Sequence, residues 1–185
     1  GSLADAMRVL LERPELVESM GLSAYEYARQ HKIPVKAHTF VWGAQAPNWI
    51  SGLNAADQRA EIEQWIRDYC TRYPDTAMID VVNEASPGHA PAAYAQNAFG
   101  NDWIIKSFQL ARQYCPNAIL ILNDYNVLSW DTDKFITLAR PVIAAGVVQR
   151  VVKTAQRQGG AVQVALTRMV EHHIEHDADV RQVEG

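Results

Sequence analysis

Residues able to do chemistry gather in three short clusters of this 185-residue sequence. The clusters are His38-Thr39-Phe40-Val41-Trp42 with Gln45, Pro47 and Trp49 soon after, then Asp80-Val81-Val82-Asn83-Glu84-Ala85, and finally Asn123-Asp124-Tyr125-Asn126. They combine aromatic rings with amide and carboxylate groups. A pyranose ring has apolar faces that stack on aromatic side chains and hydroxyls that hydrogen-bond to polar ones. The residue types therefore indicate a sugar-binding site.

Each cluster follows a predicted strand. Short apolar runs predict strands at 35–42, 77–82 and 118–122. Helical spacing predicts helices at 3–11, at 23–31, after an Asn54 cap, after an Asn101 cap, and from Asp131 or Thr132 to a stop at Gly146. Strands that alternate with amphipathic helices form a parallel sheet covered by helices. Such α/β sheets bind ligands at the carboxyl ends of their strands, where all three clusters fall.

The three clusters resemble the motifs of family-ten glycoside hydrolases, which are xylanases. In that family the patterns are close to His-Thr-Leu-Val-Trp, Asp-Val-Val-Asn-Glu and Asn-Asp-Tyr-Asn. Here they occur in the same order, and the similarity runs from about residue 25 to residue 146. One such motif alone is weak evidence, whereas three at successive strand ends make the resemblance specific.

The resemblance implies a role for each matching position. Glu84 matches the general acid/base, which protonates the leaving glycosidic oxygen, and Asn83 matches the residue that hydrogen-bonds the sugar 2-hydroxyl. The remaining matches are substrate-binding positions. His38, Trp42 and Gln45 match groups that line the subsites on the non-reducing side, and Asn123 and Tyr125 match supports around the catalytic centre. One departure is Gly43, where the family often has His.

The family's second carboxylate is not recognisable in this sequence. Retaining glycosidases need a nucleophile about 5 Å from the acid/base. In this family the nucleophile lies in a pattern near Thr-Glu-Leu-Asp, and no such pattern follows Gly146. A (β/α)₈ barrel usually takes about 250 residues. The sequence therefore predicts one α/β domain over 1–185: a half (β/α) barrel or an open α/β sheet with three or four strands. Within it, 22–146 holds the xylanase-like units, and 1–21 and 147–185 lack the family pattern.

Three functions are consistent with these features. The first is an engineered or chimeric scaffold derived from a xylanase fragment, lacking full activity and able to self-associate, for instance as a homodimer through exposed sheet edges. The second is an active retaining hydrolase of β-1,4-xylan that uses Glu84. The third is a sugar-binding module without chemistry. We favour the first because one carboxylate cannot run a double displacement.

Charge and composition limit the classes of molecule that this chain is expected to bind. The net charge of −4 argues against nucleic acid, and no apolar run approaches the length of a membrane span. Xylan or xylo-oligosaccharide is the expected ligand, and no cofactor is expected. The beginning of the sequence does not resemble a signal peptide, although family members are typically secreted, so the compartment is not readable.

Two further features have simple interpretations. His172 and His176 lie four residues apart in a His-x-x-Glu-His pattern, which makes them weak candidates for a metal site; we favour a solvated helix face, with no metal. Cys70 and Cys115, the two cysteines of the chain, each end a predicted helix. We expect two half-buried free thiols there rather than a disulfide.

Overall fold

The computed structural model describes residues 2–147, which form two compact units divided after Val35. The first unit holds α1 (Leu3–Glu12) and α2 (Pro14–Gln30). The second unit contains the sheet and the remaining helices. No helix among residues 2–147 is long and apolar enough to cross a membrane. The histidine pair at 172 and 176, the weak candidate for a metal site, lies outside the described residues.

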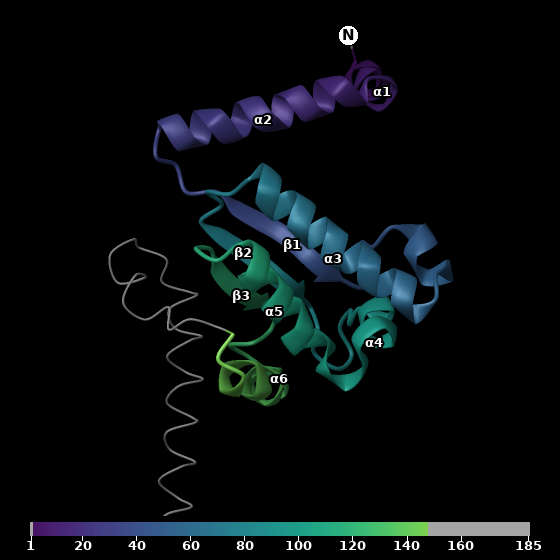
Figure 1. Ribbon diagram of the computed structural model, residues 1–185, viewed down its shortest axis with the longest axis vertical. Helices are drawn as coiled ribbons and strands as arrows, with labels where there is room; N and C mark the ends of the chain where they lie inside the picture. Colours follow the sequence, from purple (N-terminus) through teal and green to yellow (C-terminus); the bar gives the residue numbers. More distant parts are fainter. Residues whose placement is uncertain (1, 148–185) are drawn as a thin grey trace, which may run out of the picture. The chain divides into compact units, whose positions relative to one another are not determined.

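Three parallel strands form the sheet of the second unit, in the order β1-β2-β3 (Figure 1). They are β1 (Lys36–Trp42), β2 (Met78–Asn83) and β3 (Ile119–Asn123). Helices alternate with the strands: α3 (Ala55–Arg72), α4 (Ala93–Phe99), α5 (Trp103–Tyr114) and α6 (Thr132–Ala144). Short 3₁₀ turns occupy Asn48–Gly52 and Gly100–Asp102. The open parallel α/β sheet expected from the sequence is confirmed.

The core lies between the sheet and its helices. α3 and α5 lie side by side against the strands, as Figure 1 shows. Ile66 of α3 and Phe108 of α5 are fully buried against Ile79 and Val81 of β2. β2 is buried along nearly its whole length, as expected for the central strand of a parallel sheet. This packing fixes the strand ends, where the functional side chains lie.

Several helix ends were predicted correctly. The Asn54 side chain accepts hydrogen bonds of 3.0 Å from the N–H groups of Ala56 and Asp57, so it caps α3 as expected. The helix that follows Asp131 ends before Gly146, whose φ of 66° is the left-handed conformation common after helices.

Two helix starts were predicted wrongly. We expected a helix from Ser23, but α2 begins at Pro14, because proline fits the first helical position, where its missing N–H is not needed. Asn101 was expected to cap a helix, but it lies inside a 3₁₀ turn, and α5 begins at Trp103.

The prediction of two free thiols was also wrong, because Cys70 and Cys115 form a disulfide. Cys70 lies in the last turn of α3 and Cys115 directly follows α5. α3 is followed by β2 and α5 by β3, and these two strands are parallel neighbours. The carboxyl-terminal ends of both helices therefore lie near the amino ends of the strands. This brings the two Cα atoms to 5.3 Å, a separation typical of disulfides.

Candidate active site

The three sequence clusters meet at the carboxyl ends of the strands. Register places Trp42 of β1 opposite Asn83 of β2, and Asn83 opposite Asn123 of β3. Glu84 is the next residue after Asn83. The parallel sheet therefore brings together side chains that lie 40 residues apart or more in the sequence.

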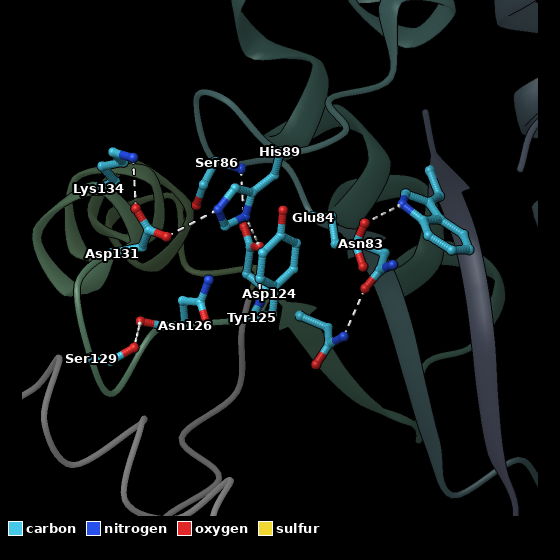
Figure 2. Close-up of polar contacts among 12 residues, drawn as sticks. Asn83, Glu84, Ser86, His89, Asp124, Tyr125, Asn126, Ser129, Asp131 and Lys134 are labelled. Atoms are coloured by element: carbon cyan, nitrogen blue, oxygen red, sulfur yellow. Dashed lines mark hydrogen bonds and ion pairs between the residues drawn. The ribbon is translucent and has the colours of Figure 1, made fainter. Parts of the chain in front are cut away.

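Glu84 lies between β1 and β3. Its carboxylate accepts a hydrogen bond of 3.0 Å from the indole Nε1–H of Trp42 (Figure 2). Its backbone has a φ of 53°, which is uncommon for a residue with a side chain. Two backbone hydrogen bonds hold this conformation: Glu84 N–H donates to Asn123 O at 2.8 Å, and Ala90 N–H donates to Glu84 O at 2.9 Å. Hydrogen bonds to the end of β3 and to the segment after Glu84 thus fix the direction of the carboxylate.

Asn83 and Asn123 form a second pair beside Glu84. The Nδ2 group of Asn123 donates to Oδ1 of Asn83 at 2.7 Å. This bond fixes the orientation of the Asn83 amide, so that its NH₂ group is the one able to donate to a ligand. Asn83 is buried, and Glu84 is only partly so.

The side chain of His38 is held in place by the buried carboxylate of Asp80. Its Nδ1 lies 2.8 Å from Oδ2 of Asp80, and Lys36 Nζ lies 2.8 Å from the same oxygen. Asp80 is fully buried, and its other oxygen, Oδ1, has no partner in the described part of the chain. The His38 ring, half exposed, meets the Trp42 ring edge-on at 5.6 Å between centroids. His38 and Trp42 therefore form one polar and aromatic surface.

Gln45 and Tyr125 lie at the periphery. Gln45 follows β1 and, with Trp42 and Trp49, helps to line a cavity of about 420 Å³. Tyr125 follows β3 and is 46% exposed, which leaves ring surface open to a ligand. Of the seven residues predicted for the site, the structure links Trp42 to Glu84, Asn83 to Asn123 and His38 to Trp42, and it places Gln45 in the loop beyond β1.

A charged cluster that the sequence did not reveal adjoins the site. His89 lies between Asp124 and Asp131, with Nδ1 at 2.5 Å from Asp124 Oδ1 and Nε2 at 3.1 Å from Asp131 Oδ2 (Figure 2). Lys134 Nζ pairs with Asp131 Oδ1 at 2.6 Å. Burial lowers the pKa of His89, but the hydrogen bonds and negative charges of the two aspartates outweigh it, so the net effect is a raised pKa. The Lys134 hydrogen bond lowers the pKa of Asp131, with a further contribution from His89.

Gly43, where the resembling family often has histidine, has a steric explanation. A Cβ atom at this position would meet the carbonyl oxygen of Pro91 and would lie 2.6 Å from that of Ala90. The Gly43 N–H also donates to Ala90 O at 3.1 Å. The segment after Glu84 therefore lies directly against the end of β1 and leaves no room for a side chain.

Replacing Gly43 by Ala should destabilise the second unit by about 1–3 kcal/mol, because the Ala90–Pro91 backbone would have to move away from the new methyl group. Gly52→Ala is the matched control, since a Cβ there meets nothing within 4 Å. Urea unfolding of both variants measures the difference. Equal stability of the two variants would mean that the 86–92 segment does not lie against Gly43.

The sequence model of glycosyl hydrolase family 10 matches residues 19–176. Endo-1,4-beta-xylanase B of Cellvibrio japonicus is 71% identical over 116 residues, which is 63% of this chain and 19% of that protein. Endo-1,4-beta-xylanase A of Caldicellulosiruptor saccharolyticus is 32% identical over 112 residues, 55% of this chain and 33% of that protein. The chain thus spans about a fifth to a third of these relatives.

Solved structures agree with the sequence comparisons. The crystal structure of the endo-1,4-beta-xylanase from Caldicellulosiruptor owensensis superposes with a TM-score of 0.60 and 25% identity, covering 71% of this chain and 43% of that one. The likeness places the open three-stranded sheet within part of a larger fold.

Proposed function

Because this chain belongs to glycosyl hydrolase family 10, we propose that its strand-end site is the proton-donating half of a β-1,4-xylan-cleaving centre. Glu84 is the general acid/base, and Trp42, which donates to its carboxylate, orients it. The observation that carries the proposal is the geometry of Glu84, whose backbone and carboxylate are both held at the junction of the three strand ends. A proton donor needs such fixed placement relative to the leaving oxygen.

Neighbouring groups supply the sugar contacts in this proposal. The oriented amide of Asn83 donates to the 2-hydroxyl, a hydrogen bond that strengthens as the bond to the leaving group breaks. The surface of His38 and Trp42, with Gln45 further out, binds sugar on the non-reducing side. Tyr125 offers an aromatic face on the opposite side of Glu84.

The proposed site is incomplete as a catalyst. A retaining mechanism forms a covalent intermediate on a second carboxylate, and the sequence holds no pattern like the family's nucleophile. In the sheet as described, β1 and β3 each pair with β2 alone. Further strands, from a longer polypeptide or from a second copy of this chain, would close these edges and could bring the missing carboxylate. We therefore propose that this chain binds xylo-oligosaccharides but does not turn them over unaided.

Isothermal titration calorimetry with xylotetraose tests the binding part of the proposal. Tyr125→Ala should weaken binding about tenfold, or by about 1.4 kcal/mol, because a stacking surface is lost. Tyr27→Ala is the matched control, since Tyr27 is an exposed aromatic residue on α2 of the other unit. No heat with the unmodified protein at millimolar ligand, or an equal loss in both variants, would overturn the proposed binding site.

A further inference from the structure

The segment that follows Glu84 is attached to the rest of the site through His89. His89 N–H donates to Ser86 O, and the next residue, Ala90, donates to Glu84 O. On the other side, Ser86 N–H donates to Oδ2 of Asp124 at 3.0 Å. His89 therefore belongs to a short turn, residues 86–90, that is hydrogen-bonded at one end to Asp124, the residue after β3, and at the other end to Glu84.

The side chain of His89 bridges two buried carboxylates. The side chains of His89, Asp124 and Asp131 are exposed by 6%, 1% and 4%. A neutral imidazole has one N–H donor, whereas both ring nitrogens of His89 face carboxylate oxygens. Both contacts are hydrogen bonds at once only when the ring is protonated, or when a carboxylate is. With Lys134 paired to Asp131, a protonated ring also balances the charge of the cluster, two negative against two positive.

The same imidazole supports Tyr125. The two rings are stacked, with 3.8 Å between centroids and 9° between planes. Tyr125 N–H also donates to Asp124 Oδ1, the oxygen that faces His89. Figure 2 shows Tyr125 drawn between the His89 cluster and Glu84. The His89 ring thus contacts the ring of Tyr125 directly, and the residue after His89, Ala90, donates a hydrogen bond to the backbone of Glu84.

We propose that His89 is a positioning residue of this site, and that its protonated ring, held between Asp124 and Asp131, fixes the 86–90 turn and with it Glu84 and Tyr125. The inference rests on the function proposed above for Glu84. The groups that face His89 are Asp124 and Tyr125 from the end of β3, and Asp131 with Lys134 at the start of α6.

The direction of the pH effect follows from this arrangement. The net raised pKa of His89 means that the folded chain holds the proton more tightly than the unfolded chain does. The bridge is therefore complete below the ordinary histidine pKa of about 6.5 and is lost as the pH rises through the higher folded value. Sugar affinity should fall over the same range, by about fivefold or more.

Nuclear magnetic resonance tests the coupling without any need for catalysis. The spectra are recorded in the His38→Gln background, because the His38 imidazole contacts the Trp42 ring and would add its own titration. In that background the Trp42 indole N–H, which bonds to Glu84, should shift with the same midpoint as the His89 ring protons. Asp131→Asn should move both midpoints down together, because it removes one of the negative charges that retain the proton. His89→Gln should abolish the Trp42 shift in this range, and His31→Gln, on the exposed end of the first unit, should leave it unchanged.

A Trp42 midpoint that differs from that of His89, or one that survives His89→Gln, would overturn the role of His89. Xylotetraose affinity, measured across the same pH range in the same His38→Gln background, should decline when His89 is present and stay flat when His89→Gln is added. If the unmodified protein binds no sugar at any pH, the proposed function fails, while the comparison of the two midpoints still decides the role of His89. A pH-dependent affinity that persists in His89→Gln would also count against it.

Discussion

Glu84→Gln should reduce the azide-dependent release of a poorly acidic phenol from an aryl β-xylobioside by about 100- to 10,000-fold, the usual contribution of a general acid. Azide stands in for the nucleophile, for which this sequence has no recognisable family motif. It attacks the anomeric carbon from the face opposite the leaving group, the bond from carbon to the glycosidic oxygen breaks, and the carboxylic acid of Glu84 passes its proton to that oxygen. Glutamine cannot supply this proton.

A second leaving group separates proton donation from a structural role. 2,4-Dinitrophenolate departs without protonation, so its release should change little in Glu84→Gln. Glu26→Gln, on the exposed surface of α2, is the matched control and should match the unmodified protein with both substrates. An equal loss with both leaving groups would indicate that the variant disturbs binding or folding, and no loss with either would remove Glu84 from the proposed role.

Removing the disulfide with Cys70→Ala and Cys115→Ala should lower stability by about 4 kcal/mol, because the bridge closes a long loop in the unfolded chain. The two cysteines are 45 positions apart in the sequence. A loss of this size lowers the melting temperature by about 10 °C for a chain of this length. Circular dichroism melting curves, with and without a thiol reductant, provide the measurement.

The reductant supplies the internal control for that experiment. It should lower the melting temperature of the unmodified protein by the same amount and leave the double variant unaffected. A melting temperature equal in all four conditions would mean that the bridge does not form in solution.

Much of the fold could be predicted from the sequence, because its signals are local. The apolar runs before Trp42, Asn83 and Asn123 located each strand to within about a residue, and Asn54 showed where α3 begins. These signals come from side-chain burial and from caps, which act over a few residues. The short helix α4 was not predicted, because its seven residues are fewer than the roughly 11 over which a helical period is recognised.

The features that were missed depend on contacts between distant residues. Cys70 pairs with Cys115 because α3 and α5 both end near the amino ends of neighbouring parallel strands. The predicted order of strands and helices was enough to infer this proximity. The bridge of His89 is different. It joins a loop, a strand end and a helix start, and the Pro-Gly-His sequence gave no sign of it. Only the acidic residue within Asn-Asp-Tyr-Asn could have suggested a basic partner nearby.

The predicted site residues depended on family resemblance, and the structure adds the reasons for their positions. Register aligns Trp42, Asn83 and Asn123 across the three strands. The left-handed backbone of Glu84 turns its carboxylate towards the indole of Trp42. The departure at Gly43 reflects the close approach of the Ala90 and Pro91 backbone, which directly follows His89.

Turnover of a phenyl β-xylobioside by the unmodified chain, with and without azide, tests the central claim most directly. A chain that brings the proton donor without the nucleophile should release no phenol above background alone, and should form the α-configured xylobiosyl azide when azide is added. Hydrolysis without azide to a sugar of retained configuration would show that a nucleophile is present. Absence of product in both conditions would show that Glu84 does not serve as a proton donor in this chain.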